Sequence, residues 1–362
     1  MFSRMFSYFR LALALAVLAF APASMPAAQG NPPAARQPVG PVKIIFDTDM
    51  GNDVDDALAL AAIHAIQSRG ICELLAVTLT CPDPLSVEYV AAVNTFYGRP
   101  GIPVGINPDS PSAMSKTQRF LDIMRRVKPD GSPVFTHNTD TSKSPRALTL
   151  LRRTLANADN GSVDIIQVGF STNLSLLLDS PADDISPLTG RELVQRKVRQ
   201  LTLMAGNFAP PAPGKPPHIE FNIRWDIPAA RNLTASWPTP VAWSGYEVGW
   251  VVRFPAWSID HDFACHPRHI IKDSYQLFEP TPHERPCWDP TAVIAAIWPE
   301  RGYFDRVKGR VSIDEKGIST FEPGEAGRDF LLKVNQSQID RLRELLAALV
   351  SQPPRGCKRK QD

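Results

Sequence analysis

Apolar runs alternate with segments of helical periodicity over most of the chain. Short runs rich in Val, Ile and Leu predict strands, at 42–46, 74–79, 163–168, 201–204 and 240–243. Helical patterns lie between or after them, at 54–68, at 86–97, from Asp289 onward and at 335–350. Strands separated by helices predict an α/β fold: an open, mostly parallel (mixed) sheet flanked by helices, with a Rossmann-like core. A hairpin over 309–321 is expected as an addition to that core.

The most informative polar segment directly follows the first predicted strand. Five carboxylates lie there within ten positions: Asp47, Asp49, Asp53, Asp55 and Asp56. Their repulsion and desolvation would be strongly unfavourable unless a cation neutralised them, and dense oxygen ligands suit Ca²⁺ or Mg²⁺ better than zinc or copper. Ligands of open α/β sheets bind beyond the carboxyl ends of strands, so the segment predicts a metal site there. An EF-hand is excluded, because the twelfth position from Asp47 is Leu58.

Both ends of the chain are predicted to lie outside the folded domain at 42–350. Residues 1–28 have the layout of a secretory signal peptide, with cleavage after Ala23 or Ala28. Their apolar stretch is short for a membrane span, so no stable membrane anchor is expected; an uncleaved anchor is the alternative. Residues 29–41 form a Pro- and Ala-rich leader expected to be disordered, and 351–362 a basic tail. The protein is therefore predicted to be periplasmic or secreted.

Net charge and cysteine content narrow the range of partners. The formal net charge of +2 gives no electrostatic reason to expect nucleic acid as a partner. The five cysteines show no CxxC spacing, which argues against a structural zinc site. Disulfides are permitted in an exported protein, and Cys265 with Cys287 is the candidate pair.

The acidic segment resembles the N-terminal signature of the nucleoside hydrolase family, Asp-x-Asp-x-Gly-x-Asp-Asp. Further segments match family elements in the same order, at 94–105, 169–174, 220–230 and 288–293. The resemblance implies the nucleoside hydrolase fold and an N-glycosyl hydrolase that releases free base and ribose from a purine or pyrimidine ribonucleoside. It also implies Ca²⁺ as the cofactor and a homodimer or homotetramer.

The same resemblance implies roles for individual residues. The protein ligands of Ca²⁺ would be three carboxylates and one backbone carbonyl: Asp49, Asp56, Asp289 and the carbonyl of Val168. The sugar hydroxyls would be held by Asp55, Glu220 and Asn222, with Asn207 as a further contact. Asp49 would also act as the general base on the attacking water, and Asp47 would support the acidic loop.

Three departures from the family pattern bear on the chemistry. The acidic loop carries two extra residues before Asp55, and Asp53 is either an additional ligand or, as we expect, a solvated loop residue. Asp83 follows the second strand where the family often has Asn, and is a candidate substitute. Trp288 stands where inosine-uridine-preferring members have a His that can protonate the leaving base, so Trp288 either stacks on the base or only packs. His283 is a candidate replacement acid, although a surface loop role is favoured.

The sequence thus predicts an exported, Ca²⁺-dependent ribonucleoside hydrolase, with two alternatives. An exported nucleoside- or sugar-binding protein without catalysis would account for Trp288 and the altered loop. A haloacid-dehalogenase-like phosphatase would use Asp47 as a phosphoryl acceptor, but it gives Glu220 and Asn222 no role.

Overall fold

Nine strands form one sheet within residues 40–111, 120–263 and 268–354, which are the residues that the computed structural model describes. In chain order they are β1 (Val42–Thr48), β2 (Cys72–Leu79), β3 (Val104–Ile106), β4 (Val163–Gln167), β5 (Val198–Met204), β6 (Val241–Ser244), β7 (Asp305–Ile313), β8 (Ser319–Pro323) and β9 (Asp329–Lys333). Their order across the sheet is β3-β2-β1-β4-β5-β6-β9-β7-β8. Adjacent strands from β3 to β9 are parallel, whereas β7 is antiparallel to both β9 and β8. The predicted mixed, mostly parallel α/β sheet is confirmed.

The five strands expected from apolar runs correspond to β1, β2, β4, β5 and β6. The expected hairpin is present as β7 and β8, but it is not an addition to the core. Strand β9, which the sequence analysis missed, pairs with β6 on one side and with β7 on the other. The hairpin is therefore continuous with the main sheet.

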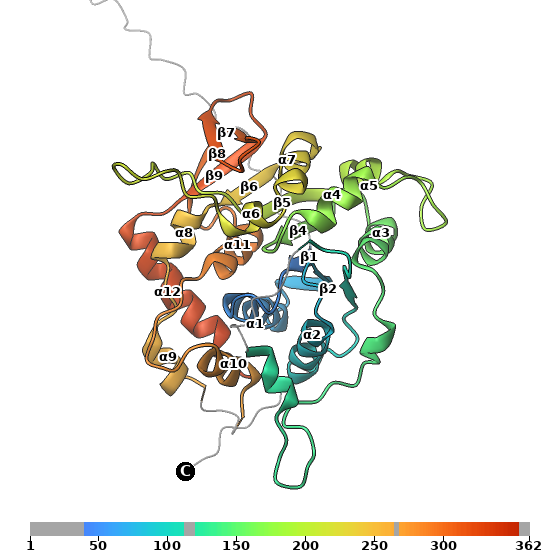
Figure 1. The fold of residues 1–362 in the computed structure, drawn as a ribbon, viewed down its shortest axis with the longest axis vertical. Helices are drawn as coiled ribbons and strands as arrows, with labels where there is room; N and C mark the ends of the chain where they lie inside the picture. The colour runs from blue at the N-terminus through green and yellow to red at the C-terminus, as the bar shows by residue number, and fades with distance from the viewer. Residues whose placement is uncertain (1–39, 112–119, 264–267, 355–362) are drawn as a thin grey trace, which may run out of the picture. The chain divides into compact units, whose positions relative to one another are not determined.

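Helices cover both faces of the sheet (Figure 1). On one face the core includes residues from α1 (Asp55–Ser68), α2 (Pro84–Phe96), η1 (Phe120–Arg125), α8 (Tyr246–Val251), α9 (Ala256–His261), α10 (Ile270–Phe278), α11 (Trp288–Ile297) and α12 (Gln336–Val350). On the other it includes residues from α3 (Ala147–Asn157), α4 (Thr172–Asp179), α5 (Gly190–Lys197), α6 (Phe221–Trp225) and α7 (Ile227–Ser236). The short helix η2 (Thr141–Lys143) has no buried residue.

The alternation of side chains along β1 explains this two-sided core. Ile44 and Phe46 pack into the first cluster, and Ile45 between them packs into the second. All three are fully buried. Because successive side chains of a strand point to opposite faces, a strand covered on both sides must be apolar throughout, which is why such strands were visible as runs.

The order of strands reverses at β1, and this reversal places the site. The chain passes from β1 to β2 and β3 on one side, and then returns to β4 on the other side of β1. Asp47 of β1 is level with Thr78 of β2 and with Gln167 of β4. Ligands of doubly wound sheets bind beyond the carboxyl ends of strands at such a reversal. The acidic loop after β1 and Val168 after β4 therefore meet at this end of the sheet.

No helix in the described part of the chain is both long and apolar enough to cross a membrane. The signal peptide expected at 1–28 lies outside the described residues, as do nearly all of the leader at 29–41 and the tail from 355 onward. Those expectations remain predictions.

Candidate active site

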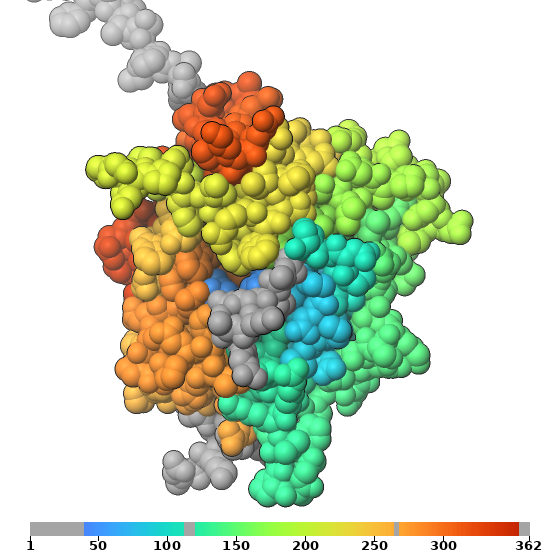
Figure 2. Space-filling model, viewed as in Figure 1, coloured from blue at the N-terminus to red at the C-terminus, as the bar shows by residue number. Residues whose placement is uncertain are grey.

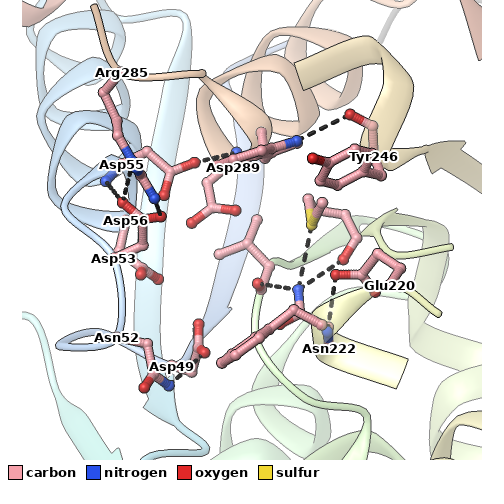
Figure 3. Close-up of a pocket in the computed structure, with 14 residues that line it drawn as sticks. Asp49, Asn52, Asp53, Asp55, Asp56, Glu220, Asn222, Tyr246, Arg285 and Asp289 are labelled. Atoms are coloured by element: carbon pink, nitrogen blue, oxygen red, sulfur yellow. Dashed lines mark hydrogen bonds and ion pairs between the residues drawn. The ribbon is translucent and has the colours of Figure 1, made fainter. Parts of the chain in front are cut away.

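A pocket of about 210 Å³ opens beyond the carboxyl ends of β1, β4 and β5 (Figure 3). Nine residues that the sequence analysis assigned to the site line it: Asp49, Asp53, Asp55, Asp56, Val168, Glu220, Asn222, Trp288 and Asp289. Five further residues that line it had not been assigned to the site: Asn52, Met204, Phe221, Tyr246 and Arg285. In the space-filling view, blue atoms from the first part of the domain are visible deep in a hollow bordered by yellow and orange segments (Figure 2).

The loop between β1 and α1 brings the acidic side chains to the pocket. Gly51 has a φ of 117°, a conformation that side-chain-bearing residues rarely adopt, and it lets the loop turn back toward the sheet. The backbone N–H of Met50 donates to Thr48 Oγ1 over 3.1 Å within the same turn. Asp55 and Asp56 then fall in the first turn of α1, where the helix dipole favours carboxylates.

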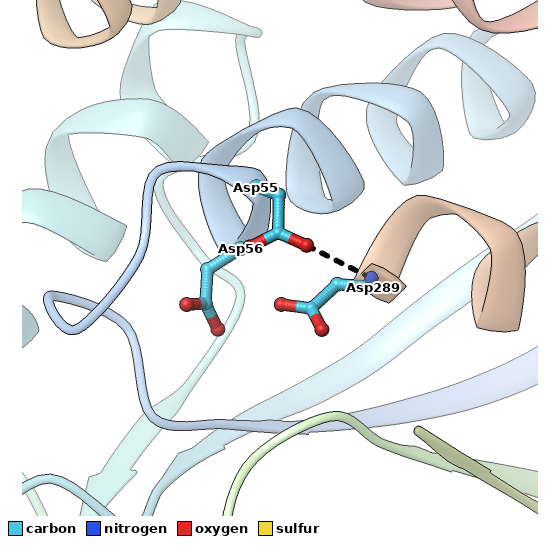
Figure 4. A group of neighbouring side chains, drawn as sticks. All are labelled: Asp55, Asp56 and Asp289. Carbon is cyan, nitrogen blue, oxygen red and sulfur yellow. Dashed lines mark hydrogen bonds between the residues drawn. The ribbon is translucent and has the colours of Figure 1, made fainter. Parts of the chain in front are cut away.

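Three of the pocket's carboxylates, Asp55, Asp56 and Asp289, form a carboxylate cluster whose ligand oxygens all lie within 4.8 Å of one another (Figure 4). Asp289 comes from the first turn of α11, and its backbone N–H donates to Asp55 Oδ2 over 3.1 Å. Thr48 Oγ1 donates to Asp56 Oδ1. The other oxygen of Asp56, Oδ2, is buried and has no hydrogen-bond partner among the described residues.

Burial is the main cause of raised pKa values in this pocket. It raises the pKa of Asp55, Asp56 and Asp289 well above the usual range, and repulsion from neighbouring carboxylates adds to the effect. Burial also raises the pKa of Asp49 and of Glu220 to about 7. An opposite charge in the pocket would favour the ionised forms again. The buried oxygen of Asp56 and the density of carboxylates therefore fit a bound metal cation.

Asp49 lines the pocket beside the carboxylate cluster. Its Oδ2 accepts a hydrogen bond from Asn52 Nδ2 over 2.7 Å, so Asn52 holds the side chain in place. The carboxylate cluster contains Asp55, expected to bind the sugar, and not Asp49, expected to be a metal ligand. All of the expected ligands nevertheless border one pocket.

Glu220 and Asn222 form the opposite wall (Figure 3). The carboxylate of Glu220 accepts hydrogen bonds from the backbone N–H groups of Asn222, Ile223 and Gly206, over 2.8, 3.2 and 3.3 Å. It thereby caps α6. Asn222 Nδ2 donates to the carbonyl of Val168 over 2.7 Å and to that of Met204 over 3.0 Å. This pair of residues therefore ties the ends of β4 and β5 to α6.

Asp53 is not the solvated loop residue that we expected. Arg285 Nε donates to its Oδ1 over 2.9 Å, and Arg285 Nη2 donates to its Oδ2. The two side chains are only 21% and 23% exposed. The extra length of the acidic loop thus carries a carboxylate that pairs with an arginine from a distant segment, which local sequence could not indicate.

A row of aromatic rings forms the third wall. Trp288 stacks on Tyr246, with ring centres 5.5 Å apart, and Trp250 stacks on Tyr246 at 5.7 Å. The indole N–H of Trp288 donates to the carbonyl of Tyr246 over 2.9 Å. Gly249 makes the close packing feasible, because a Cβ there would lie 2.2 Å from Trp288 Cδ1.

Three residues expected at the site lie elsewhere. Asn207 follows β5, but Gly206 has a φ of 83° and turns the chain away, so that Asn207 Oδ1 accepts from the N–H of Ala209. Asp83 caps α2 by accepting from the N–H of Leu85 over 2.9 Å. His283 stacks on Tyr275, with ring centres 4.3 Å apart. None of the three lines this pocket, so the structure gives none of them contact with its contents.

Two further expectations concern buried side chains. Asp47 is fully buried behind the acidic loop and accepts hydrogen bonds from Thr78 and Asn173. Cys287 is a buried free thiol, so the candidate disulfide is wrong for this structure; its other member, Cys265, lies outside the described residues. Burial raises the pKa of the Cys287 thiol well above its usual range, which leaves the thiol protonated.

The fold and the site thus define an α/β protein with a candidate metal site at its strand reversal, where the ligands of such sheets bind. The family model of the inosine-uridine preferring nucleoside hydrolases matches residues 44–339, and the chain belongs to this family. The phosphatase alternative is therefore wrong. Its proposed phosphoryl acceptor, Asp47, is fully buried and lies outside the pocket lining.

Solved structures with the same fold include two nucleoside hydrolases and one effector protein. A plant nucleoside hydrolase, PpNRh1, is similar with a TM-score of 0.65 and 18% identity, over 86% of this chain and 100% of that one. A purine-preferring ribonucleoside hydrolase from Gardnerella vaginalis is similar with a TM-score of 0.64 and 17% identity, over 85% and 98%. The type III effector protein XopQ, solved with adenosine diphosphate ribose, is similar with a TM-score of 0.60 and 18% identity, over 87% and 94%. No curated protein matches the chain.

Proposed function

We propose that the protein is an exported, Ca²⁺-dependent hydrolase that cleaves the N-glycosidic bond of ribonucleosides to free base and ribose. Membership of the nucleoside hydrolase family supports the reaction class. The observation that carries the proposal is a buried carboxylate cluster that faces Glu220 and Asn222 across one pocket. Ribose presents several hydroxyl groups, and such a pocket offers them acceptors on both sides.

The residues proposed to hold the cation are Asp49, Asp56 and Asp289, together with the carbonyl of Val168. The buried, unpartnered Oδ2 of Asp56 supports this assignment. Ca²⁺ tolerates an irregular set of carboxylate and carbonyl ligands, whereas Mg²⁺ demands a near-octahedral one with several waters. When bound, the cation would supply a positive charge beside the ribose diol and a water of lowered pKa.

The chain's own groups would then divide the work as follows. Asp49, held by Asn52, accepts the proton of the attacking water, and such general-base help contributes roughly 10²–10⁴-fold. Asp55 accepts a hydrogen bond from a ribose hydroxyl. Carboxylates around the sugar stabilise the positive charge that the ring gains as the bond breaks. Trp288 and Tyr246 offer aromatic faces to the base.

The direct test is ribose release from a panel of purine and pyrimidine ribonucleosides, with and without EDTA. Asp49→Asn is compared with Asp184→Asn, a matched change at an exposed carboxylate outside the pocket. We expect chelator-sensitive release by wild type and Asp184→Asn, and a loss of about 100-fold or more in Asp49→Asn. Release that persists in EDTA would overturn the metal requirement, and full activity of Asp49→Asn would overturn its role.

A second candidate function is nucleoside binding without turnover. The observation that favours it is Trp288 in the position of the family's leaving-group acid. Calorimetry with a ribonucleoside and Ca²⁺ distinguishes the two candidates. Binding without any ribose release would support the binding protein, whereas turnover would exclude it.

Export and assembly complete the proposal. Removal of residues 1–28 during export predicts a mature protein whose mass lacks that segment, found in the periplasm or medium. We also propose a homodimer or homotetramer, since the family resemblance implies one. Intact-mass measurement of the mature protein and light scattering after size exclusion test these two points; an uncut chain or a monomer would contradict them.

A further inference from the structure

Arg285 is the only basic residue among the described residues that line the pocket. Its guanidinium carbon lies 4.9 Å from the ring centre of Phe278 and 5.4 Å from that of Trp288. Asp53 fixes one edge of the guanidinium through the two hydrogen bonds described above. The flat group is therefore held in one orientation in the wall of the pocket (Figure 3).

The pairing with Asp53 leaves part of the guanidinium available. Arginine has five N–H donors, and Asp53 takes one from Nε and one from Nη2. The two donors of Nη1 and the second donor of Nη2 make no hydrogen bond to any residue in the described part of the chain. These donors form a second fork that can meet two acceptors of a ligand.

The aromatic row indicates which part of a nucleoside reaches this fork. The ring of Trp288 stacks on that of Tyr246, with centres 5.5 Å apart, and also contacts the guanidinium of Arg285 at 5.4 Å. A planar base stacks on aromatic faces, whereas the carboxylates and Asn222 suit the sugar. Because Arg285 contacts the ring of Trp288 and lines the same pocket, a base beside this row would have an edge within reach of the free donors.

We propose that Arg285 is a catalytic residue that donates hydrogen bonds to the leaving base and stabilises the negative charge that the base gains. It would serve in place of the acid that Trp288 replaces. This inference rests on the proposed function and deepens it, because it also selects the substrate. The preferred substrates are ribonucleosides whose base carries an oxo group, 6-oxopurines in particular.

The chemistry balances without another reactant. The oxygen of the attacking water forms a bond to C1′ of the ribose, and Asp49 accepts its proton. The bond from C1′ to the base nitrogen breaks, and its electron pair stays with the base. Arg285 remains protonated and hydrogen-bonds the base anion, which then takes a proton from solvent. Asp49 returns its proton to solvent, and the products are ribose and the neutral base.

The expected preference for 6-oxopurines follows from the free N–H donors of Arg285. A 6-oxopurine presents O6 and N7 as two adjacent acceptors, which is the pattern that arginine reads with a bidentate contact in guanine. Adenine presents an amino group in place of O6, and two sets of donors would face each other. Because the guanidinium stays charged throughout the accessible pH range, the interaction does not depend on a titrating acid.

The test compares leaving groups. We would measure kcat and KM for inosine, adenosine and 4-nitrophenyl β-D-ribofuranoside with wild type, Arg285→Gln and Arg253→Gln. Arg253 stacks on Trp250 at 4.7 Å but does not line the pocket, so it controls for loss of an arginine from the aromatic row. Nitrophenolate is a good leaving group and needs little stabilisation. We expect Arg285→Gln to lose about 100-fold in kcat on inosine and far less on the nitrophenyl riboside.

Further readouts separate this role from a structural one. Asp53→Asn keeps the guanidinium but loosens it, and we expect a smaller loss with the same dependence on the leaving group. The preference for inosine over adenosine should fall in Arg285→Gln and not in Arg253→Gln. Ca²⁺ binding by calorimetry and the circular dichroism spectrum verify that each variant is folded.

Equal losses of kcat on inosine and on the nitrophenyl riboside would overturn the inference, because Arg285 would then act on the sugar or on the loop. An unchanged inosine-to-adenosine preference in Arg285→Gln would overturn the assigned substrate class. If wild type released ribose from neither substrate, the proposed function itself would fail. That result differs from the two others, in which wild type is active.

Discussion

Replacing Asp289 by Asn is expected to stabilise the protein in the absence of metal and to remove most of the stabilisation expected from the proposed Ca²⁺. The ligand oxygens of Asp55, Asp56 and Asp289 lie within 4.8 Å of one another. At that separation and an effective dielectric constant of about 20, two unit charges repel each other by about 3 kcal/mol. Burial and mutual repulsion raise the pKa of Asp56 and Asp289, which favours their protonated forms, so we expect a smaller gain, about 1–2 kcal/mol.

Asp164 provides the matched control, because replacing it by Asn should lower the stability of the metal-free protein, whereas Asp289→Asn should raise it. Asp164 is 1% exposed, compared with 4% for Asp289. Its carboxylate, however, accepts hydrogen bonds from Arg199, with Nε donating over 2.8 Å. Asp164→Asn loses these charge-assisted bonds and should destabilise the protein by about 1.5–3 kcal/mol.

Thermal unfolding in EDTA and in excess CaCl₂ measures both effects. For a domain of about 310 residues, each kcal/mol shifts Tm by only about 1.5 °C. Ca²⁺ at 100 times its Kd should stabilise wild type and Asp164→Asn by about 2.7 kcal/mol. A lower Tm for Asp289→Asn in EDTA would refute the repulsion argument. A Ca²⁺-induced shift equal to that of wild type would remove Asp289 from the ligand set.

Three further predictions concern individual side chains. Burial lowers the pKa of His64 to about 3 in the folded protein. The unfolded protein therefore binds more protons at this residue below pH 6.5, and the free energy of unfolding falls as the pH drops from 6.5 toward 3. At pH 5 the loss of stability is about 2 kcal/mol. In urea unfolding, the difference in unfolding free energy between wild type and His64→Gln should therefore narrow by that amount from pH 7 to pH 5. A difference that stays constant contradicts this prediction. Gly249→Ala should displace Trp288 and raise KM for ribonucleosides with the circular dichroism spectrum unchanged, and a wild-type KM would contradict the packing argument. The two carboxylate oxygens of Glu220 accept hydrogen bonds from three backbone N–H groups, whereas the amide of Glu220→Gln has only one acceptor oxygen. The free energy of unfolding should therefore fall by about 1–3 kcal/mol. An unchanged Tm would contradict this.

The sequence was most informative where a strand is buried on both faces. β1, β2, β4, β5 and β6 were visible as apolar runs for that reason. β9 was missed because its five residues begin with Asp329 and end with Lys333, and only its neighbours in the sheet make it a strand.

Single residues of the candidate site were likewise hard to predict where contacts distant in the sequence decide their position. The acidic loop was recognisable because its carboxylates lie within ten positions, and residues 288–293 because they resemble a family element. Arg285 carried no such signal, since its partner Asp53 lies 232 positions away. Asn207 was misplaced because the turn at Gly206, not the end of β5, decides where its side chain points.

The carboxylate cluster joins the beginning of the domain to its end. Asp55 and Asp56 are among the first residues of the domain to be synthesised, whereas Asp289 follows after most of the sheet. A shortened chain that lacks α11 therefore has only part of the cluster and should hold the cation weakly. Because binding free energy at such a site is also folding free energy, the cation stabilises only chains in which α11 has docked beside α1. Metal uptake during refolding would then report that α11 has docked beside α1 and distinguish these molecules from those in which it has not.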